Sequence, residues 1–227
     1  MLLDIGLHGK AIVVIGGGRV GERKATKFLA AGANVVVVSN DFTKRLGRLG
    51  ADGKLQLIPV YLHGSREQIG KLTSKADFII AATNQPELNR RIADEAKKRR
   101  IHVNVVDNPQ LGDFTMPDES KIGEFRIAIS TGGKSPAMSS LLRRRIEGLI
   151  RDEDIQMVRL QSYARKLAKA RLPNQQSRKR VVDAIMEDKE IRNLLKESNL
   201  QEAKKITRRI IRSWWRVEGR TRHIGEA

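Results

Sequence analysis

The stretch from Ala11 to Gly21, AIVVIGGGRVG, limits what the chain can fold into more than any other part of the sequence. Its first five residues are apolar and predict a buried strand, and three glycines follow in the spacing G-x-G-x-x-G before a helical pattern begins. The first glycine permits a tight turn, the second lets the backbone approach a pyrophosphate, and the third lets the helix pack closely on the strand. Unpaired N–H groups at the helix start favour an anion. We therefore predict a dinucleotide-binding turn formed by Gly16, Gly18, Arg19, Val20 and Gly21.

Strand and helix patterns then alternate through the first 107 residues. Further strands are predicted at 33–39, 55–62, 77–83 and 102–107, and a strongly helical pattern begins at Pro86. Unbroken apolar runs such as ANVVVVS are typical of parallel strands buried on both faces. The predicted fold class is α/β, with a Rossmann-type doubly wound parallel sheet, followed from Pro136 onward by helices.

Two of the predicted strands, 33–39 and 77–83, end in small polar residues, at the edge where parallel sheets bind dinucleotides. An acidic residue just after the second strand, Asp41, can accept hydrogen bonds from the ribose hydroxyls of NAD. Two cationic residues, Lys44 and Arg45, follow it, so NADP stays open as an alternative while NAD is favoured. The contacts predicted at these strand ends are Ser39, Asp41, Thr83 and Asn84.

A second glycine-rich stretch, STGGKSP at residues 130–136, lies between a predicted strand and a helical pattern. Its glycines and serines offer backbone donors to an anion, and its lysine adds positive charge. A triphosphate-binding loop is a poor interpretation, because no glycine stands five residues before Gly133. The predicted anion contacts here are Gly132, Gly133, Lys134 and Ser135.

The net charge of +18 favours anionic partners of some kind. Half of that excess falls in residues 151–227, although a merely solvated basic surface is an equal alternative. The absence of cysteine excludes disulfides and thiolate chemistry, the four histidines show no metal-ligand spacing, and we predict no metal site. The sequence also has no apolar run of membrane-spanning length and no signal-peptide pattern, so we predict a soluble cytoplasmic protein.

Four separated stretches of the chain together resemble one known family: GKAIVVIGGGRVGERKATKFLAAGANVVVVS, AATNQPELNRRIADEAKKRRIHVNVVDNP, DFTMP and RIAISTGGKSPAMSSLLRRRIE. They cover roughly residues 1–150, and neither NVVD nor STGGKSP is a general feature of dinucleotide-binding folds. The set is similar to the precorrin-2 dehydrogenase family, which includes the N-terminal module of multifunctional siroheme synthases. Thr115 departs from the family's F-I-M-P or F-I-F-P pattern, within a loop.

The resemblance implies NAD-dependent oxidation of precorrin-2, an anionic tetrapyrrole, to sirohydrochlorin; some members also insert ferrous iron to give siroheme. It further implies a homodimer with its active site in a cleft between domains. We expect an NAD-binding domain over residues 1–113, a dimerisation segment over 114–150 and a basic helical domain over 151–227. Asp107 matches the family's important aspartate, and Thr131 matches a serine associated with the anionic substrate or with modification.

The residues fit such chemistry in their own right. The nicotinamide carries the hydride, so the protein has to orient the reactants and handle protons. Asp107 closes a strand at the ligand edge, where a carboxylate can accept a proton, although a turn-capping aspartate is the alternative. His102 lies five residues away and faces the opposite side of the strand, which leaves iron insertion open. Cations that could bind substrate carboxylates, or lie on a solvated helix face, are Lys134, Arg143, Arg144 and Arg145.

A regulator that senses NAD and binds nucleic acid through its basic helices is the competing hypothesis. The stretch KKITRRIIRSWWR could contact phosphates. No zinc-finger or RNA-recognition signature supports it, so nucleic acid is not a predicted partner.

Overall fold

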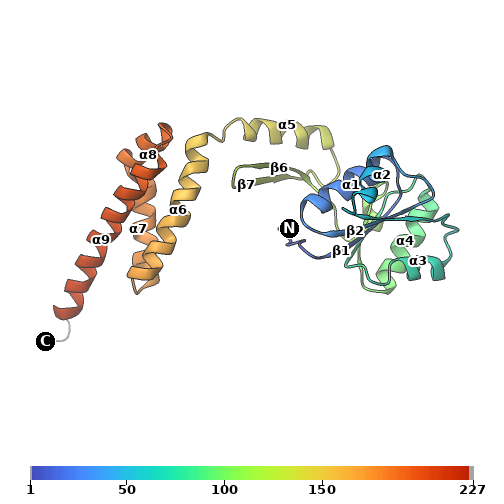
Figure 1. The fold of residues 1–227 in the computed structure, drawn as a ribbon, viewed down its shortest axis with the longest axis horizontal. Coiled ribbons are helices and arrows are strands. Elements are labelled where there is room, and N and C mark those ends of the chain that lie inside the picture. Colours follow the sequence, from blue (N-terminus) through green and yellow to red (C-terminus); the bar gives the residue numbers. More distant parts are fainter. Residues whose placement is uncertain (1, 225–227) are drawn as a thin grey trace. The chain divides into compact units, whose positions relative to one another are not determined.

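The computed structural model describes residues 2–224, with side chains through Arg216. The chain forms two compact units, Met1–Met116 and Pro117–Ala227, and each is described by itself. Figure 1 shows a sheet flanked by helices in the first unit, and a short hairpin followed by helices in the second.

The first unit is built on a five-stranded parallel sheet with the strand order β3-β2-β1-β4-β5. The chain runs outward from β1 to β3, then returns to the other side of β1 for β4 and β5. The strand order therefore reverses between β1 and β4, which is where such sheets bind ligands at their carboxyl edge. The strands are β1 (Ala11–Ile15), β2 (Asn34–Ser39), β3 (Gln56–Pro59), β4 (Phe78–Ala81) and β5 (His102–Val105).

Helices cover both faces of this sheet, and side chains that alternate along β1 belong to two separate cores. Ile12 and Val14 pack in the cluster that includes Phe28 of α1, whereas Val13 and Ile15 pack in the cluster that includes Ile92 of α4. Burial on both sides explains why β1 and β4 are apolar throughout. The helices are α1 (Arg19–Ala30), α2 (Lys44–Ala51), α3 (Arg66–Leu72) and α4 (Pro86–Lys98), with a 3-10 turn η1 (Pro109–Leu111) after β5.

The second unit contains an antiparallel hairpin with a helix packed on it, and then a bundle of helices with a core of its own. Arg159 of the bundle donates to Glu124 at the hairpin turn over 2.7 Å. The elements are β6 (Asp118–Ile122), β7 (Phe125–Ile129), α5 (Pro136–Glu147), α6 (Asp152–Arg171), α7 (Gln175–Glu187), α8 (Lys189–Lys196) and α9 (Leu200–Ile224).

The α/β fold class and the parallel sheet are confirmed, with local differences. Neither helix α2 nor strand β6 was predicted. The strand predicted over 55–62 is shorter, since the chain leaves the sheet at Pro59, where a proline cannot donate to a ladder. The division into segments at 113 and 150 stays a prediction. Within residues 2–224, no helix is both long and apolar enough to cross a membrane.

Candidate dinucleotide-binding and catalytic site

The turn between β1 and α1 is packed so tightly that only glycine fits at three of its positions. A Cβ added to Gly16 would lie 2.3 Å from the Ala82 carbonyl oxygen, and one added to Gly21 would lie 1.8 Å from the Gly16 carbonyl oxygen. Gly17 would meet the Asp41 carbonyl oxygen at 2.1 Å. Gly16 also has a φ of 122°, a backbone conformation that other residues rarely adopt. The turn is therefore fixed against β2 and β4.

Gly18 differs from these three glycines, because an added Cβ would meet no heavy atom within 4 Å. It is the N-cap of α1 and carries no side chain that could accept from the first N–H groups of that helix. By contrast, Thr43 caps α2 and Ser65 caps α3 with side-chain oxygens. The start of α1 is thus left open to an anion.

A cavity of about 640 Å³ lies over this turn, at the carboxyl ends of β1, β2 and β4. Every residue predicted to contact the cofactor lines it, except Gly21, which packs beneath Gly16. Its size suits an extended nucleotide rather than a water cluster. The open space at Gly18 and the uncapped helix fit a pyrophosphate, so the residues present fit a dinucleotide.

Asp107 follows β5, two strands along the sheet from the turn, and its side chain is exposed. It does not line the cavity but is joined to it through a buried amide. Asn89 of α4 donates from Nδ2 to Asp107 Oδ1 over 2.9 Å, and its Oδ1 accepts from the Thr83 hydroxyl at 2.7 Å. His102 lies at the opposite end of β5, paired with Asp113 and stacked on Phe78.

Sequence reasoning missed two residues of this site. Tyr61, just past β3, lines the cavity and is 61 % exposed. Gln68 holds its loop, donating to the Tyr61 carbonyl at 2.9 Å and accepting from His63 N–H at 3.0 Å. For Tyr61, the sequence signal was an aromatic residue near the end of a strand. The second missed residue is Asn89, and its sequence signal was an amide on the apolar face of a predicted helix.

The second glycine-rich stretch lies in the other unit and forms the turn from β7 into α5. Thr131 Oγ1 accepts from Ser135 N–H at 2.9 Å, and the Ser135 hydroxyl accepts from Met138 N–H to cap α5. Gly132 and Gly133 have φ values of 63° and 83°, and a Cβ on either would meet nothing within 4 Å. With the exposed Lys134, these glycines form a projecting cationic turn.

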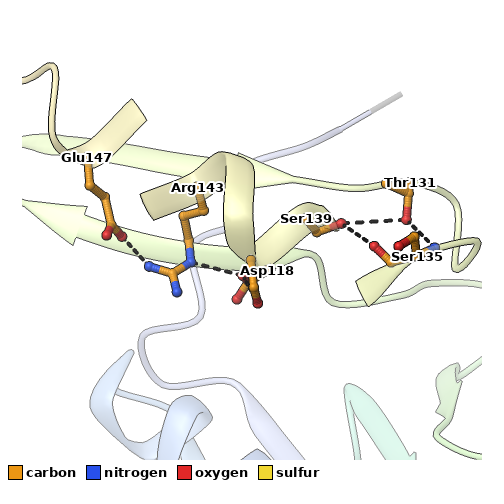
Figure 2. A network of polar contacts seen from close by, with 7 residues as sticks. Asp118, Thr131, Ser135, Ser139, Arg143 and Glu147 are labelled. Atoms are coloured by element: carbon orange, nitrogen blue, oxygen red, sulfur yellow. Dashed lines mark hydrogen bonds and ion pairs between the residues drawn. The ribbon is translucent and has the colours of Figure 1, made fainter. Parts of the chain in front are cut away.

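Arg143 is engaged within the second unit, as Figure 2 shows. Its Nε donates to Asp118 of β6 at 2.9 Å and its Nη1 pairs with Glu147 of the same helix. The pKa of Glu147 lies below its ordinary value, first because the Ser120 hydroxyl faces it and then because Arg143 does. Arg143 therefore joins α5 to the hairpin, and of the predicted cations Lys134, Arg144 and Arg145 are exposed.

Two family models match successive parts of the chain. One, described as putative NAD(P)-binding, matches residues 3–118, and the other, described as sirohaem biosynthesis protein central, matches residues 126–149. A precorrin-2 dehydrogenase of Methanosarcina barkeri is 38% identical over 199 residues, covering 87% of both chains. The chain belongs to the precorrin-2 dehydrogenase and siroheme synthase family.

Other members of this family match with different coverage. A putative precorrin-2 dehydrogenase of Methanocaldococcus jannaschii is 31% identical, over 85% of this chain and 93% of its own length. A siroheme synthase of Xylella fastidiosa is 33% identical, but the chain spans 41% of that longer protein. A solved structure titled SirC, precorrin-2 dehydrogenase, shares the fold, with a TM-score of 0.73 at 21% identity over 92% of this chain and 99% of that one.

Proposed function

We propose that this protein is an NAD-dependent dehydrogenase that oxidises precorrin-2 to sirohydrochlorin. Two observations together support the proposal. The glycine turn fits a pyrophosphate, and the chain is 38% identical to a precorrin-2 dehydrogenase along 87% of its length. A nucleic-acid-binding regulator would need neither the STGGKSP turn nor an exposed carboxylate beyond β5.

In this proposal the two halves of the cofactor extend over the two halves of the sheet. With the pyrophosphate at Gly18, the adenosine half extends over β2 and β3, and the nicotinamide half extends over β4 and β5. Asp41 then accepts from the adenosine ribose, which favours NAD over NADP, and the exposed Tyr61 ring lies on the adenosine side. Thr83 and Asn84 lie on the nicotinamide side.

The carboxylate of Asp107 supplies the proton transfer in this proposal. Oxidation removes a hydride and a proton from the tetrapyrrole, and the bound nicotinamide accepts the hydride. Asp107 is exposed at the β5 edge, on the nicotinamide half of the sheet, where it can accept the proton. The projecting turn of Thr131–Ser135 binds substrate carboxylates through Lys134 and its backbone N–H groups.

We further propose that the second unit mediates a homodimer. Met138, Leu142 and Ile146 recur every four residues on α5 and are 45%, 37% and 39% exposed, and Leu149 just beyond is 75% exposed. A two-stranded hairpin and one helix can form only a small hydrophobic core by themselves. A second copy of this chain would cover the exposed apolar face of α5. Leu142→Glu is expected to convert a dimer to a monomer in sedimentation analysis; a variant that stays dimeric would exclude this face.

Replacing the proposed proton acceptor tests the mechanism. Asp107→Ala is expected to lower turnover by roughly 10²- to 10⁴-fold, because a general base is lost, while NAD affinity stays unchanged. NADH absorbance reports turnover, and a fluorescence titration reports affinity. Turnover equal to the wild type would show that the carboxylate is a structural cap. Product spectra with and without ferrous iron decide whether the enzyme also makes siroheme.

A further inference from the structure

One buried side chain links the cofactor cavity to the exposed carboxylate of Asp107. Asn89 is 1% exposed, within the apolar face of α4. Its Oδ1 accepts from the Thr83 N–H at 3.2 Å and from the Thr83 hydroxyl at 2.7 Å. Its Nδ2 donates to the Thr83 carbonyl at 3.2 Å and to Asp107 Oδ1 at 2.9 Å. Both the oxygen and the nitrogen of this amide are therefore hydrogen-bonded, to residues that follow two neighbouring strands.

The partners also fix which way this amide points. A backbone N–H can only donate, so Asn89 Oδ1 has to face Thr83. The Nδ2 group is then left to face a carbonyl and a carboxylate, both of which only accept. A rotated amide would lose these bonds inside a buried site, where an unpaired polar group is costly. The Asp107 carboxylate is thus held by a donor that cannot turn away.

We propose that Asn89 is a positioning residue for the dehydrogenase reaction, holding the Asp107 carboxylate in register with the Thr83 end of the cofactor cavity. This inference rests on the proposed function. Asn89 does not line the cavity, so it acts through Asp107 and Thr83 and touches neither substrate nor cofactor. A hydrogen bond to a charged group is among the stronger ones, which makes one buried amide sufficient for the task.

Asn89→Asp separates the two ends of this amide. The new side chain keeps an oxygen for the Thr83 donors, but it replaces the Nδ2 donor with a second oxygen that faces the Asp107 carboxylate and the Thr83 carbonyl. We expect kcat to fall roughly 10- to 100-fold, as for the loss of a hydrogen bond to a charged group, while the Kd for NAD changes less than about threefold.

Asn104→Asp is the matched control. Asn104 of β5 is also a buried asparagine, 4% exposed, and its Nδ2 donates to the Phe114 carbonyl at 2.9 Å instead of to Asp107. This variant also buries a carboxylate and loses one donor bond to a backbone carbonyl, so its loss of stability measures these two effects away from Asp107. A kcat that falls equally in both variants would reduce Asn89 to a structural role and overturn the proposal.

A double-mutant cycle tests whether the two residues act as one unit. If Asn89 acts through Asp107, then adding Asn89→Asp to Asp107→Ala leaves the residual single-turnover rate unchanged. Rate losses that multiply would contradict the proposal.

Side-chain hydrogen exchange by NMR tests the contact without any substrate. One Asn89 Nδ2 proton is expected to exchange faster in Asp107→Ala than in the wild type, because it loses its acceptor. Equal exchange in the two proteins would overturn the proposal. If the wild-type protein forms no NADH from precorrin-2, the proposed function is refuted instead. The two outcomes can be told apart because exchange of the Asn89 Nδ2 proton does not depend on turnover.

Discussion

The two glycine-rich turns of this chain use the same residue for different reasons. At the β1–α1 turn, Gly16 and Gly21 have no room for a methyl group, since backbone oxygens lie 2.3 and 1.8 Å from their built Cβ positions. At the β7–α5 turn, Gly132 and Gly133 have open space, and only their positive φ values require glycine. The first turn is a rigid cradle and the second is a projecting surface. A cofactor's pyrophosphate suits the former, and a substrate with peripheral carboxylates suits the latter.

The largest effect is expected from filling the packed turn. Gly21→Ala would push the Gly16 carbonyl, which is backbone and cannot rotate away as a side chain would. We expect the first unit to lose about 3 kcal/mol of stability or more, together with NAD binding. Calorimetry and a cofactor titration measure the two. A variant with wild-type melting and affinity would show that the turn is not tightly packed.

Gly18 is expected to separate cofactor binding from folding. The Cβ of Gly18→Val has room in the protein, so melting should fall only by the weaker N-cap preference of valine, whereas the side chain would occupy the space assigned to the pyrophosphate. The Kd for NAD should rise at least about tenfold, equivalent to about 1.4 kcal/mol. Unchanged affinity would place the pyrophosphate elsewhere.

The projecting turn should tolerate substitution better. Gly132→Ala is expected to cost about 1–2 kcal/mol, because its φ of 63° is unfavourable for alanine, and to leave NAD affinity intact. The KM for precorrin-2 is the parameter that should change. If NAD affinity fell instead, the two turns would not have the separate roles assigned to them.

The smallest effect concerns acid stability, which each unit draws from a different carboxylate. The pKa of Asp77 lies below its ordinary value, chiefly because the Ala11 backbone N–H donates to it and then because of Lys10; the pKa of Glu147 is lowered by Ser120 and Arg143. Their stabilising contributions are complete above the ordinary pKa values and are lost as the pH falls through the lowered ones.

Glu147→Gln should therefore flatten the acid limb of the second unit alone, and Asp77→Asn that of the first. Urea unfolding between pH 7 and pH 3, followed separately in each unit, checks this. A change in both units from one substitution would contradict it.

The sequence made the sheet predictable because local pattern and tertiary environment agree there. Runs such as VVVV in β2 are apolar since both faces of the strand are buried. The glycine spacing after β1 directly predicts the turn that follows it. Helix α2 was missed because it buries only Leu46, and β6, with the sequence DESKI, is half-buried and polar. Such elements take their structure from packing partners rather than from a strong local pattern.

The cavity-lining residues that the sequence pointed to were recognisable for the same reason, since each lies at the end of a recognisable strand or at the glycine turn. The Asn89–Asp107 contact was not, because it joins residues 18 apart that follow different periodic patterns. Only the folded sheet brings the start of α4 beside the end of β5.

The proposed oxidation of precorrin-2 by NAD can be measured by mixing the purified protein with both compounds under anaerobic conditions and recording NADH and the tetrapyrrole spectrum together. One NADH is expected for each sirohydrochlorin formed, since one hydride leaves each substrate molecule. A protein that binds NAD at the Gly18 turn yet forms no NADH from precorrin-2, with either NAD or NADP, would contradict the proposal.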